Sequence, residues 1–255
     1  SDMLSFYTHE DYTDFWQSSD VQNQLAHWFS PLGETARQND VRISFHPDQF
    51  VVLASDRPEV VNKSIEEFEY HVDMARWMGY GKQFQDIKIN VHISGRAGPE
   101  GIRQAYKRLS PEARNSLTIE NEEITHDLHT VLQIKDLVPI VLDIHHHWVS
   151  SGEYIQPTDD RVKMVIDSWR GIRPTMHYSV SREEYLVDHP RDTLPTLNTL
   201  IESGLHKQKI RAHSDYFWND ACNNWALSFN DKFDIMCESK AKNLASMKLF
   251  ETKNV

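Results

Sequence analysis

Short apolar runs rich in β-branched residues alternate with helical patterns along this chain. Turn residues bound seven such runs after residue 40, at residues 42–46 (RISFH), 88–92 (KINVH), 117–120 (LTIE), 141–146 (VLDIHH), 174–177 (PTMH), 210–213 (IRAH) and 236–238 (MCE). Helical patterns precede and separate them, at residues 5–40, 58–77, 105–109, 126–136, 159–171 and 240–251. Strands that alternate with helices in this way predict βα units around a parallel sheet.

The helix at 58–77 has the clearest boundary signals. Ser55 and Asp56 precede it, Pro58 stands in its first turn and Gly79 follows its end. Proline is favoured in a first helical turn and glycine just past a last one, so these residues predict both ends of the helix.

Two parallel architectures fit the alternation, a closed barrel and an open doubly wound sheet. We prefer an α/β barrel of the TIM type, (β/α)8, because metal-type side chains end six or seven successive strands, whereas an open sheet usually builds its site at one switch point. A closed barrel needs eight strands, so we expect one or two N-terminal strands to be missing from this chain. With 255 residues, 39% of them hydrophobic, we expect a single domain over residues 1–255.

The side chains at the strand ends are of metal-binding type. They are His46, His92, Glu120, Asp143, His146, His177, His213 and Glu238. Parallel strands bring their carboxyl ends to one rim, so we expect these residues to converge. A lone catalytic zinc takes about three protein ligands, so this set suffices for two or three divalent ions. Imidazole and carboxylate ligands without thiolates favour Mn or Zn over Mg or Ca.

The run VLDIHHHW carries the strongest local signal. Asp143 ends a buried strand, where a carboxylate without a partner would be costly, and this favours a bound cation. His146 is preferred as a ligand on its three-residue spacing from Asp143, and His145 and His147 remain alternatives. In LTIENEE, Glu120 and Glu122 point to one side of a strand, and Glu120 lies nearer the end of the apolar run.

The loop after His46 carries Gln49 and Phe50 in the motif SFHPDQFV. An aromatic ring that stacks and an amide that hydrogen-bonds suit the recognition of unstacked bases. Clustered divalent ions activate water and hold both the attacking and the leaving oxygens of a phosphodiester. Phosphodiester hydrolysis is therefore the reaction class that the residues favour.

Composition limits the other classes of function. The net charge of −11 argues against a generally basic nucleic-acid-binding surface, although bound divalent cations would offset part of it. The two cysteines, Cys222 and Cys237, have no CxxC spacing, and no G-x-G-x-x-G or P-loop motif supports a nucleotide cofactor. No apolar run reaches the roughly 18–20 residues of a membrane span, so we expect a soluble, intracellular protein without membrane contacts.

Taken in order, SFHPDQFVVLAS, NVHISG, LTIENE, VLDIHHH, MHYS, AHSDY and CESKAKN resemble the UV-damage endonuclease family. These enzymes are metal-dependent TIM barrels related to endonuclease IV and to xylose-isomerase-like barrels. The resemblance implies that His46, His92 and Glu120 hold one metal, that Glu120, Asp143, His177 and Glu238 hold a second, and that His146 and His213 hold a third. Glu120, Asp143, His177 and Glu238 would be catalytic. Manganese is favoured, with zinc or cobalt as alternatives.

The reaction implied is incision of double-stranded DNA immediately 5′ of a UV photoproduct or an abasic site, by a monomer. Gln49 and Phe50 match the pair that wedges into DNA at the lesion. Phe50 stands where the family commonly has Tyr, and Thr175, two residues before His177, stands where it commonly has Lys. The enzyme would work in the cytoplasm or nucleoid, or in the nucleus or mitochondrion of a eukaryote.

Two other functions remain open. A xylose-isomerase-like sugar isomerase would use similar ligands, but in a closed pocket with a substrate-binding Lys. A catalytically inactive protein that binds damaged DNA is the second alternative, motivated by Thr175 and by the missing N-terminal strands.

Overall fold

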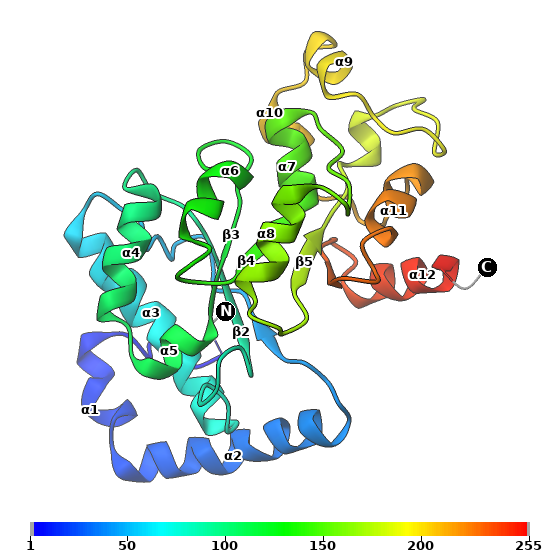
Figure 1. Ribbon diagram of the computed structural model, residues 1–255. Helices are drawn as coiled ribbons and strands as arrows, with labels where there is room; N and C mark the ends of the chain where they lie inside the picture. Colours follow the sequence, from blue (N-terminus) through cyan, green and yellow to red (C-terminus); the bar gives the residue numbers. More distant parts are fainter. Residues whose placement is uncertain (1–2, 254–255) are drawn as a thin grey trace. The chain divides into compact units, whose positions relative to one another are not determined.

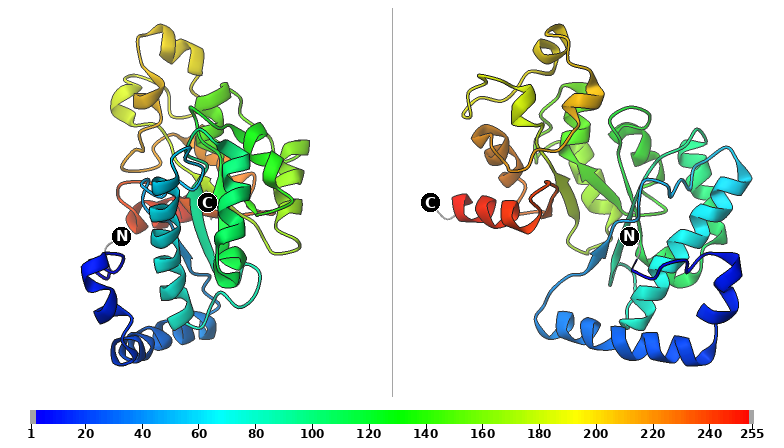
Figure 2. Two further views of the ribbon diagram at one scale, coloured as in Figure 1. Left: turned by 90° about the vertical axis from the view of Figure 1, so that its left-hand side faces the viewer. Right: turned by 180° about the vertical axis from the view of Figure 1, so that it is seen from behind.

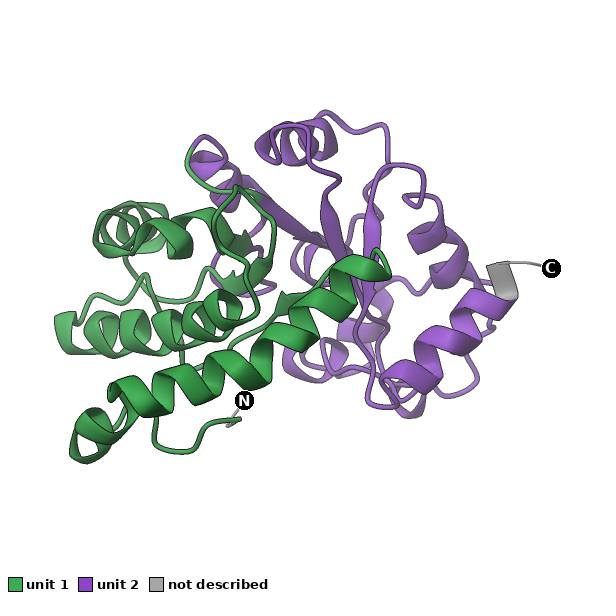
Figure 3. Cartoon of the chain, turned by 90° about the horizontal axis from the view of Figure 1, so that it is seen from below, with its two compact units in different colours: residues 1–119, 137–139 green, residues 120–136, 140–255 purple. Residues whose placement is uncertain are grey.

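The computed structural model describes residues 3–253 of an α/β protein. The chain divides into two compact units (Figure 3). Unit 1 contains residues 1–119 and 137–139, and unit 2 contains residues 120–136 and 140–255. A single domain over residues 1–255 stays a prediction. Among the described residues, no helix is both long and apolar enough to cross a membrane.

Unit 1 contains the first half of the alternating pattern. Its elements are the 3-10 helix η1 (Glu10–Tyr12), α1 (Thr13–Trp16), α2 (Ser19–Gln38), β1 (Ser44–Phe45), α3 (Pro58–Trp77), β2 (Lys88–His92), α4 (Gly98–Arg108), α5 (Pro111–Ser116) and β3 (Leu117–Glu120), whose last residue belongs to unit 2. β1 pairs in parallel with β2. The predicted ends of the helix at 58–77 are confirmed by α3.

The core of unit 1 lies where α2 packs against α3 (Figure 2). Leu25 and Phe29 are buried four positions apart on α2, the spacing that places side chains on one helix face. They join a cluster of buried residues that includes Tyr70, Met74 and Ile87. The burial of this face holds α3 in place, and with it the strands that precede and follow it.

Unit 2 contains the rest of the chain. Its elements are α6 (Leu128–Val131), η2 (Leu132–Ile134), β4 (Ile140–Asp143), α7 (Ile144–Ser151), α8 (Asp160–Ser168), β5 (Thr175–Tyr178), η3 (Glu183–Tyr185), α9 (Leu197–Glu202), α10 (Lys207–Ile210), α11 (Asp220–Leu227), β6 (Asp234–Cys237) and α12 (Asn243–Lys253). β5 pairs in parallel with both β4 and β6. Helices α7 and α8 pack beside β4 (Figure 1), whose side chains are all buried, as expected for a covered parallel strand.

The parallel α/β class predicted from the sequence is confirmed, but a complete eight-stranded barrel is not. Residues 3–253 contain six strands. The strand predicted at 210–213 is wrong, because the amides of Lys209 and Ile210 bond back to the His206 carbonyl and close a short helix, α10. His213 makes only an isolated antiparallel bridge with Ser181. The segment 210–213 has too few apolar side chains to be stabilised as a buried strand of the sheet.

Gly95, in the turn after β2, tests the close packing of unit 1. Its φ is +109°, and a Cβ there would lie 2.3 Å from the Ala54 carbonyl oxygen. Gly171 has a φ of +91°, but a Cβ there would meet no heavy atom within 4 Å, so this glycine isolates the backbone effect. We expect Gly171→Ala to lower the free energy of unfolding by about 1 kcal/mol and Gly95→Ala by about 3 kcal/mol or more. Urea denaturation measures both, and equal losses would contradict the steric argument.

Candidate metal centre

Asp143 ends β4 and caps the helix that follows. Its Oδ1 accepts a hydrogen bond of 2.7 Å from the His146 amide, which makes Asp143 the N-cap of α7. The predicted extension of the strand to residue 146 is therefore wrong, since the helix begins at Ile144. The three-residue spacing between Asp143 and His146 is the spacing of an N-cap to the amide that it binds. It fixes the His146 backbone relative to the carboxylate.

The second oxygen of Asp143 is available for a cation. Asp143 is completely buried, and its Oδ2 accepts no hydrogen bond. The pKa of Asp143 is raised to about 7. Burial is the largest cause, His146 acts against it, and the nearby carboxylates of Glu120 and Glu238 add to the rise. The same oxygen lies 3.8 Å from His146 Nδ1. A buried carboxylate oxygen without a hydrogen bond is costly, so this position fits a bound cation.

Four ligand atoms of unit 2 converge at the ends of its strands. Those of Glu120, Asp143, His177 and Glu238 all lie within 4.8 Å of one another. The sheet register creates this cluster, because Asp143 of β4 stands opposite His177 of β5. The Glu238 amide bonds the Tyr178 carbonyl at 2.8 Å and so continues the pairing of β6 with β5 by one residue. Three carboxylates and one imidazole form a donor set suited to Mn²⁺ or Zn²⁺.

His177 lies between two of these carboxylates. Its Nδ1 is 3.1 Å from Glu120 Oε1 and 3.1 Å from Glu238 Oε1. Burial alone would raise the pKa of Glu238, but the adjacent His177 outweighs it and lowers this pKa to about 2. The environment thus shifts the pKa values of Asp143 and Glu238 in opposite directions, a pattern that is common at functional sites.

His146 faces the same carboxylates from α7. Its Nδ1 lies 3.1 Å from the Asn121 carbonyl oxygen and 3.7 Å from Glu120 Oε1. Burial alone would lower the pKa of His146, but the carboxylates around it, with Asp143 the strongest, raise this pKa to about 9.

Sequence reasoning missed Glu123. This carboxylate is 5% exposed, pairs with Arg211, and has its Oε2 3.7 Å from His146 Nε2. The only signal for it was a third acid in the run ENEE, which solvated surface segments also show.

The other two histidines of the run point elsewhere. His145 is buried, with Nδ1 2.8 Å from Ser179 Oγ and Nε2 3.0 Å from Ser181 Oγ. His147 contacts Glu153 through Nε2 at 3.1 Å. Of the three, only His146 lies beside Glu120 and Asp143.

His145 supports the loop that carries His213. Ser181 forms the backbone bridge to His213, and the Ser214 amide bonds the Val180 carbonyl at 2.9 Å. Through its two serine contacts, His145 holds the segment that forms this bridge. His213 Nε2 lies 3.9 Å from Glu238 Oε2, so the loop brings His213 to the edge of the carboxylate cluster without a strand of its own.

In unit 1, the strand-end histidines form a pair. The rings of His46 and His92 are 5.0 Å apart, and the Asn90 amide nitrogen lies 3.4 Å from His46 Nε2. Asn90 is itself held by Thr118, whose hydroxyl donates to it at 2.9 Å. These contacts orient His46 at the end of β1.

The remaining predicted positions lie in contrasting surroundings. Gln49 is exposed, and Phe50 is 78% exposed, next to Val51, which is buried at 2%. An aromatic ring thus stands in solvent on a loop that buried neighbours anchor.

Thr175 is buried at the start of β5, two positions before His177 and therefore on the same face of the strand.

The family model and the curated relatives that match this chain agree on one family. The family model of UV-endonuclease UvdE matches residues 1–254. The UV DNA damage endonuclease of Bacillus cereus (strain G9842) is 28% identical over 239 residues, which cover 88% of this chain and 67% of that protein. The UV DNA damage endonuclease of Bacillus thuringiensis subsp. konkukian (strain 97-27) is 27% identical over the same length and coverage. The crystal structure of SacUVDE superposes with a TM-score of 0.71 and 24% sequence identity. The match covers 98% of this chain and 76% of the SacUVDE chain, so the two proteins share a fold.

Metal binding should depend on pH, because protons and cations compete for the same atoms. The folded pKa of Asp143, about 7, lies above its ordinary value of 3.8, so its contribution to the stability of the metal-free chain is present below about pH 4 and is lost as the pH rises through 7. The cation requires the ionised form. We expect the affinity for Mn²⁺ to fall by about tenfold or more between pH 7.5 and pH 5.5.

Isothermal titration calorimetry in two buffers of different ionisation enthalpy measures both the affinity and the protons released. Asp143→Asn should weaken Mn²⁺ binding at every pH and remove its share of the released protons. An affinity that stays constant from pH 5.5 to 7.5 would contradict the assignment.

Proposed function

The chain belongs to the UV-endonuclease UvdE family, and we propose that it is a metal-dependent DNA repair endonuclease that hydrolyses the phosphodiester immediately 5′ of a lesion. UV photoproducts and abasic sites in double-stranded DNA are the lesions that we assign to it. The observation that carries the proposal is the convergence of Glu120, Asp143, His177 and Glu238, with one buried carboxylate oxygen that has no hydrogen-bond partner.

We assign two or three divalent ions to the site, with Mn²⁺ favoured over Zn²⁺ or Co²⁺. Glu120, Asp143, His177 and Glu238 would hold one of them. His146 with His213 would supply ligands for another, and the paired rings of His46 and His92 would offer ligands within unit 1. When bound, such ions polarise the scissile phosphate and lower the pKa of a water molecule that attacks it.

The protein side chains prepare this site in three ways. Contact between His177 and the carboxylates of Glu120 and Glu238 orients both acids. The capping bond of Asp143 fixes the start of α7, and with it His146. The raised pKa of His146 lets this residue hold a proton whose charge offsets the carboxylates when no cation is present. The cluster can therefore fold before its ions arrive.

Gln49 and Phe50 are proposed to read the lesion. Their exposure on an anchored loop suits a pair that enters a distorted base stack, because every base offers a face to an aromatic ring. Phenylalanine keeps the stacking that a tyrosine would provide and lacks only the hydroxyl contact. Phosphate contacts elsewhere would position the duplex, and this pair would discriminate damaged from undamaged DNA.

Glu120→Gln tests the catalytic assignment. The amide keeps the shape of the side chain but removes the charge that a cation needs, so we expect incision to fall by about a thousandfold or more, with duplex affinity little changed. Glu122→Gln makes the same charge change two residues along the chain and should keep near-normal activity. Incision on a gel and binding by fluorescence anisotropy measure the two effects. Near-normal cutting by Glu120→Gln would remove this residue from the role.

The double variant Gln49→Ala, Phe50→Ala tests lesion reading. We expect the preference for a damaged over an undamaged duplex to fall by about tenfold or more, since base–aromatic stacking contributes roughly 1–3 kcal/mol per base. Affinity for the undamaged duplex should stay close to that of the wild type. Equal losses on both duplexes would instead assign the pair a general binding role.

A further inference from the structure

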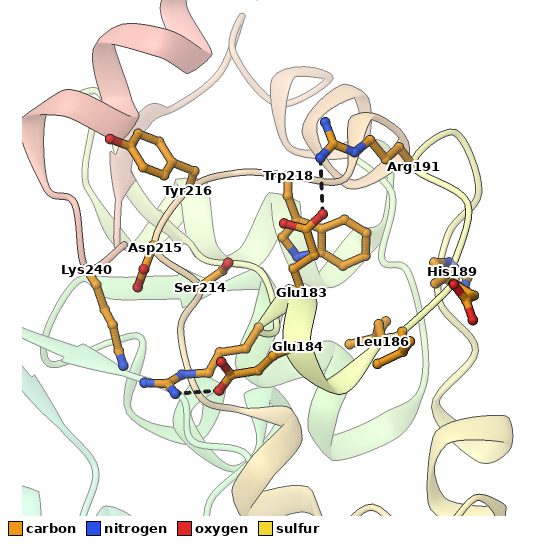
Figure 4. Close-up of a pocket in the computed structure, with 13 residues that line it drawn as sticks. Glu183, Glu184, Leu186, His189, Arg191, Ser214, Asp215, Tyr216, Trp218 and Lys240 are labelled. Carbon is orange, nitrogen blue, oxygen red and sulfur yellow. Dashed lines mark hydrogen bonds and ion pairs between the residues drawn. The ribbon is translucent and has the colours of Figure 1, made fainter.

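A pocket of about 790 Å³ lies within unit 2 (Figure 4). Its walls come from residues 182–191 after β5, residues 214–218 after His213, and Lys240 after Glu238. The Lys240 amide bonds the Ser214 carbonyl at 3.1 Å, which joins two of these walls. The segments that form the pocket thus continue directly from those that present His177, His213 and Glu238. A nucleotide next to the reacting phosphodiester would lie at this pocket.

Both arginines of the pocket are in ion pairs, whereas its lysine is in none among the described residues. Arg182 Nη1 contacts Glu184 Oε1 at 2.7 Å, and Arg191 contacts Glu183 at 3.1 Å. No carboxylate pairs with the ammonium of Lys240 in the part of the chain that the structure describes. Figure 4 shows the Lys240 side chain pointing toward the guanidinium that is bonded to Glu184. Two cationic side chains of the pocket are therefore directed toward one another, and a single carboxylate is paired with one of them.

In the ion pair between Arg182 and Glu184, another anion can take the place of the Glu184 carboxylate. The Glu184 side chain is 60% exposed and that of Arg182 is 27% exposed, and solvent-exposed ion pairs contribute little to stability. A phosphate can accept a bidentate, charge-assisted contact from arginine, and its negative charge can also attract the ammonium of Lys240. A phosphate placed here would gain two cations, while Glu184 would return to water.

We propose that Lys240 and Arg182 bind a backbone phosphate of the DNA strand next to the scissile one, and that Glu184 gives up Arg182 when this phosphate binds. The inference rests on the proposed function. Asp188 and Asp215 also line the pocket and would oppose the binding of free inorganic phosphate, so the phosphate that we assign to it belongs to a duplex held by its other contacts. In a chain of net charge −11, a carboxylate that competes with DNA for its arginine also limits non-specific binding.

Lys240→Gln tests the first half of the proposal, with Lys163→Gln as its matched control. Lys163 is exposed on α8, which packs beside β4 and lines no wall of the pocket. The measurement is the affinity for an undamaged duplex as a function of salt. Each phosphate contact contributes about one to the slope of log affinity against log salt. We expect this slope to fall by about one in Lys240→Gln, with affinity about fivefold weaker at low salt, and to stay unchanged in Lys163→Gln.

Glu184→Gln tests the exchange. Removal of the competing carboxylate leaves Arg182 available, so we expect tighter binding of the same duplex by about threefold or more. Glu202→Gln, an equal charge change at an exposed position of α9, is the control. A general electrostatic effect would increase affinity equally in both variants, and that result would overturn the exchange.

The outcomes separate this inference from the proposed function. If the wild type incises damaged DNA while Lys240→Gln and Lys163→Gln show the same slope of log affinity against log salt, the phosphate site is overturned. That result leaves the proposed nuclease function in place. If the wild type, with Mn²⁺ present, neither binds nor cuts damaged DNA, both are overturned. All the substituted side chains are exposed, and circular dichroism spectra matching that of the wild type show that each variant folds.

Discussion

The concentration of negative charge at the strand ends of unit 2 is the constraint on which the rest of the site depends. Glu120 and Asp143 are completely buried, and the ligand atoms of both lie within 4.8 Å of those of Glu238. Carboxylates this close do not all ionise without positive charge among them. The chain itself supplies part of that charge through His146, and it leaves one oxygen of Asp143 without a hydrogen-bond partner. A divalent cation is the group that satisfies this arrangement most directly.

Local structure explains why the cluster forms where it does. Parallel pairing of β4 with β5 places Asp143 opposite His177, and the capping bond of Asp143 sets the first turn of α7. One side chain therefore ends a strand, begins a helix and faces the cluster. His213 reaches the same place by another route, on a loop held by the backbone of Ser181, which His145 supports in turn. The buried polar contacts around the cluster serve to position its ligands.

Much of the fold and of the candidate site could be predicted from the sequence, because apolar periodicity and strand-end residues are local signals. The parallel α/β class and the bounds of α3 are examples. Prediction failed where one local sequence pattern is compatible with two different local structures. A spacing of three residues suits both a pair of ligands and an N-cap, so the start of α7 at Ile144 was missed. The run IRAH resembled a strand, and only its bonds to His206 show a helix. Glu123 and the pairing of Arg182 with Glu184 depend on tertiary contacts that no local pattern reports.

Incision of a duplex that carries one site-specific thymine dimer tests the metal-dependent nuclease most directly. The unaltered chain is assayed with Mn²⁺ and with a chelator, and the cut is mapped on a sequencing gel. We expect a single cut directly 5′ of the dimer that requires the metal and leaves a 3′-hydroxyl end. Cutting that persists in chelator, or a cut at another position, would contradict it. Binding to the damaged duplex without any cut would instead favour a protein that recognises damage and has lost catalysis.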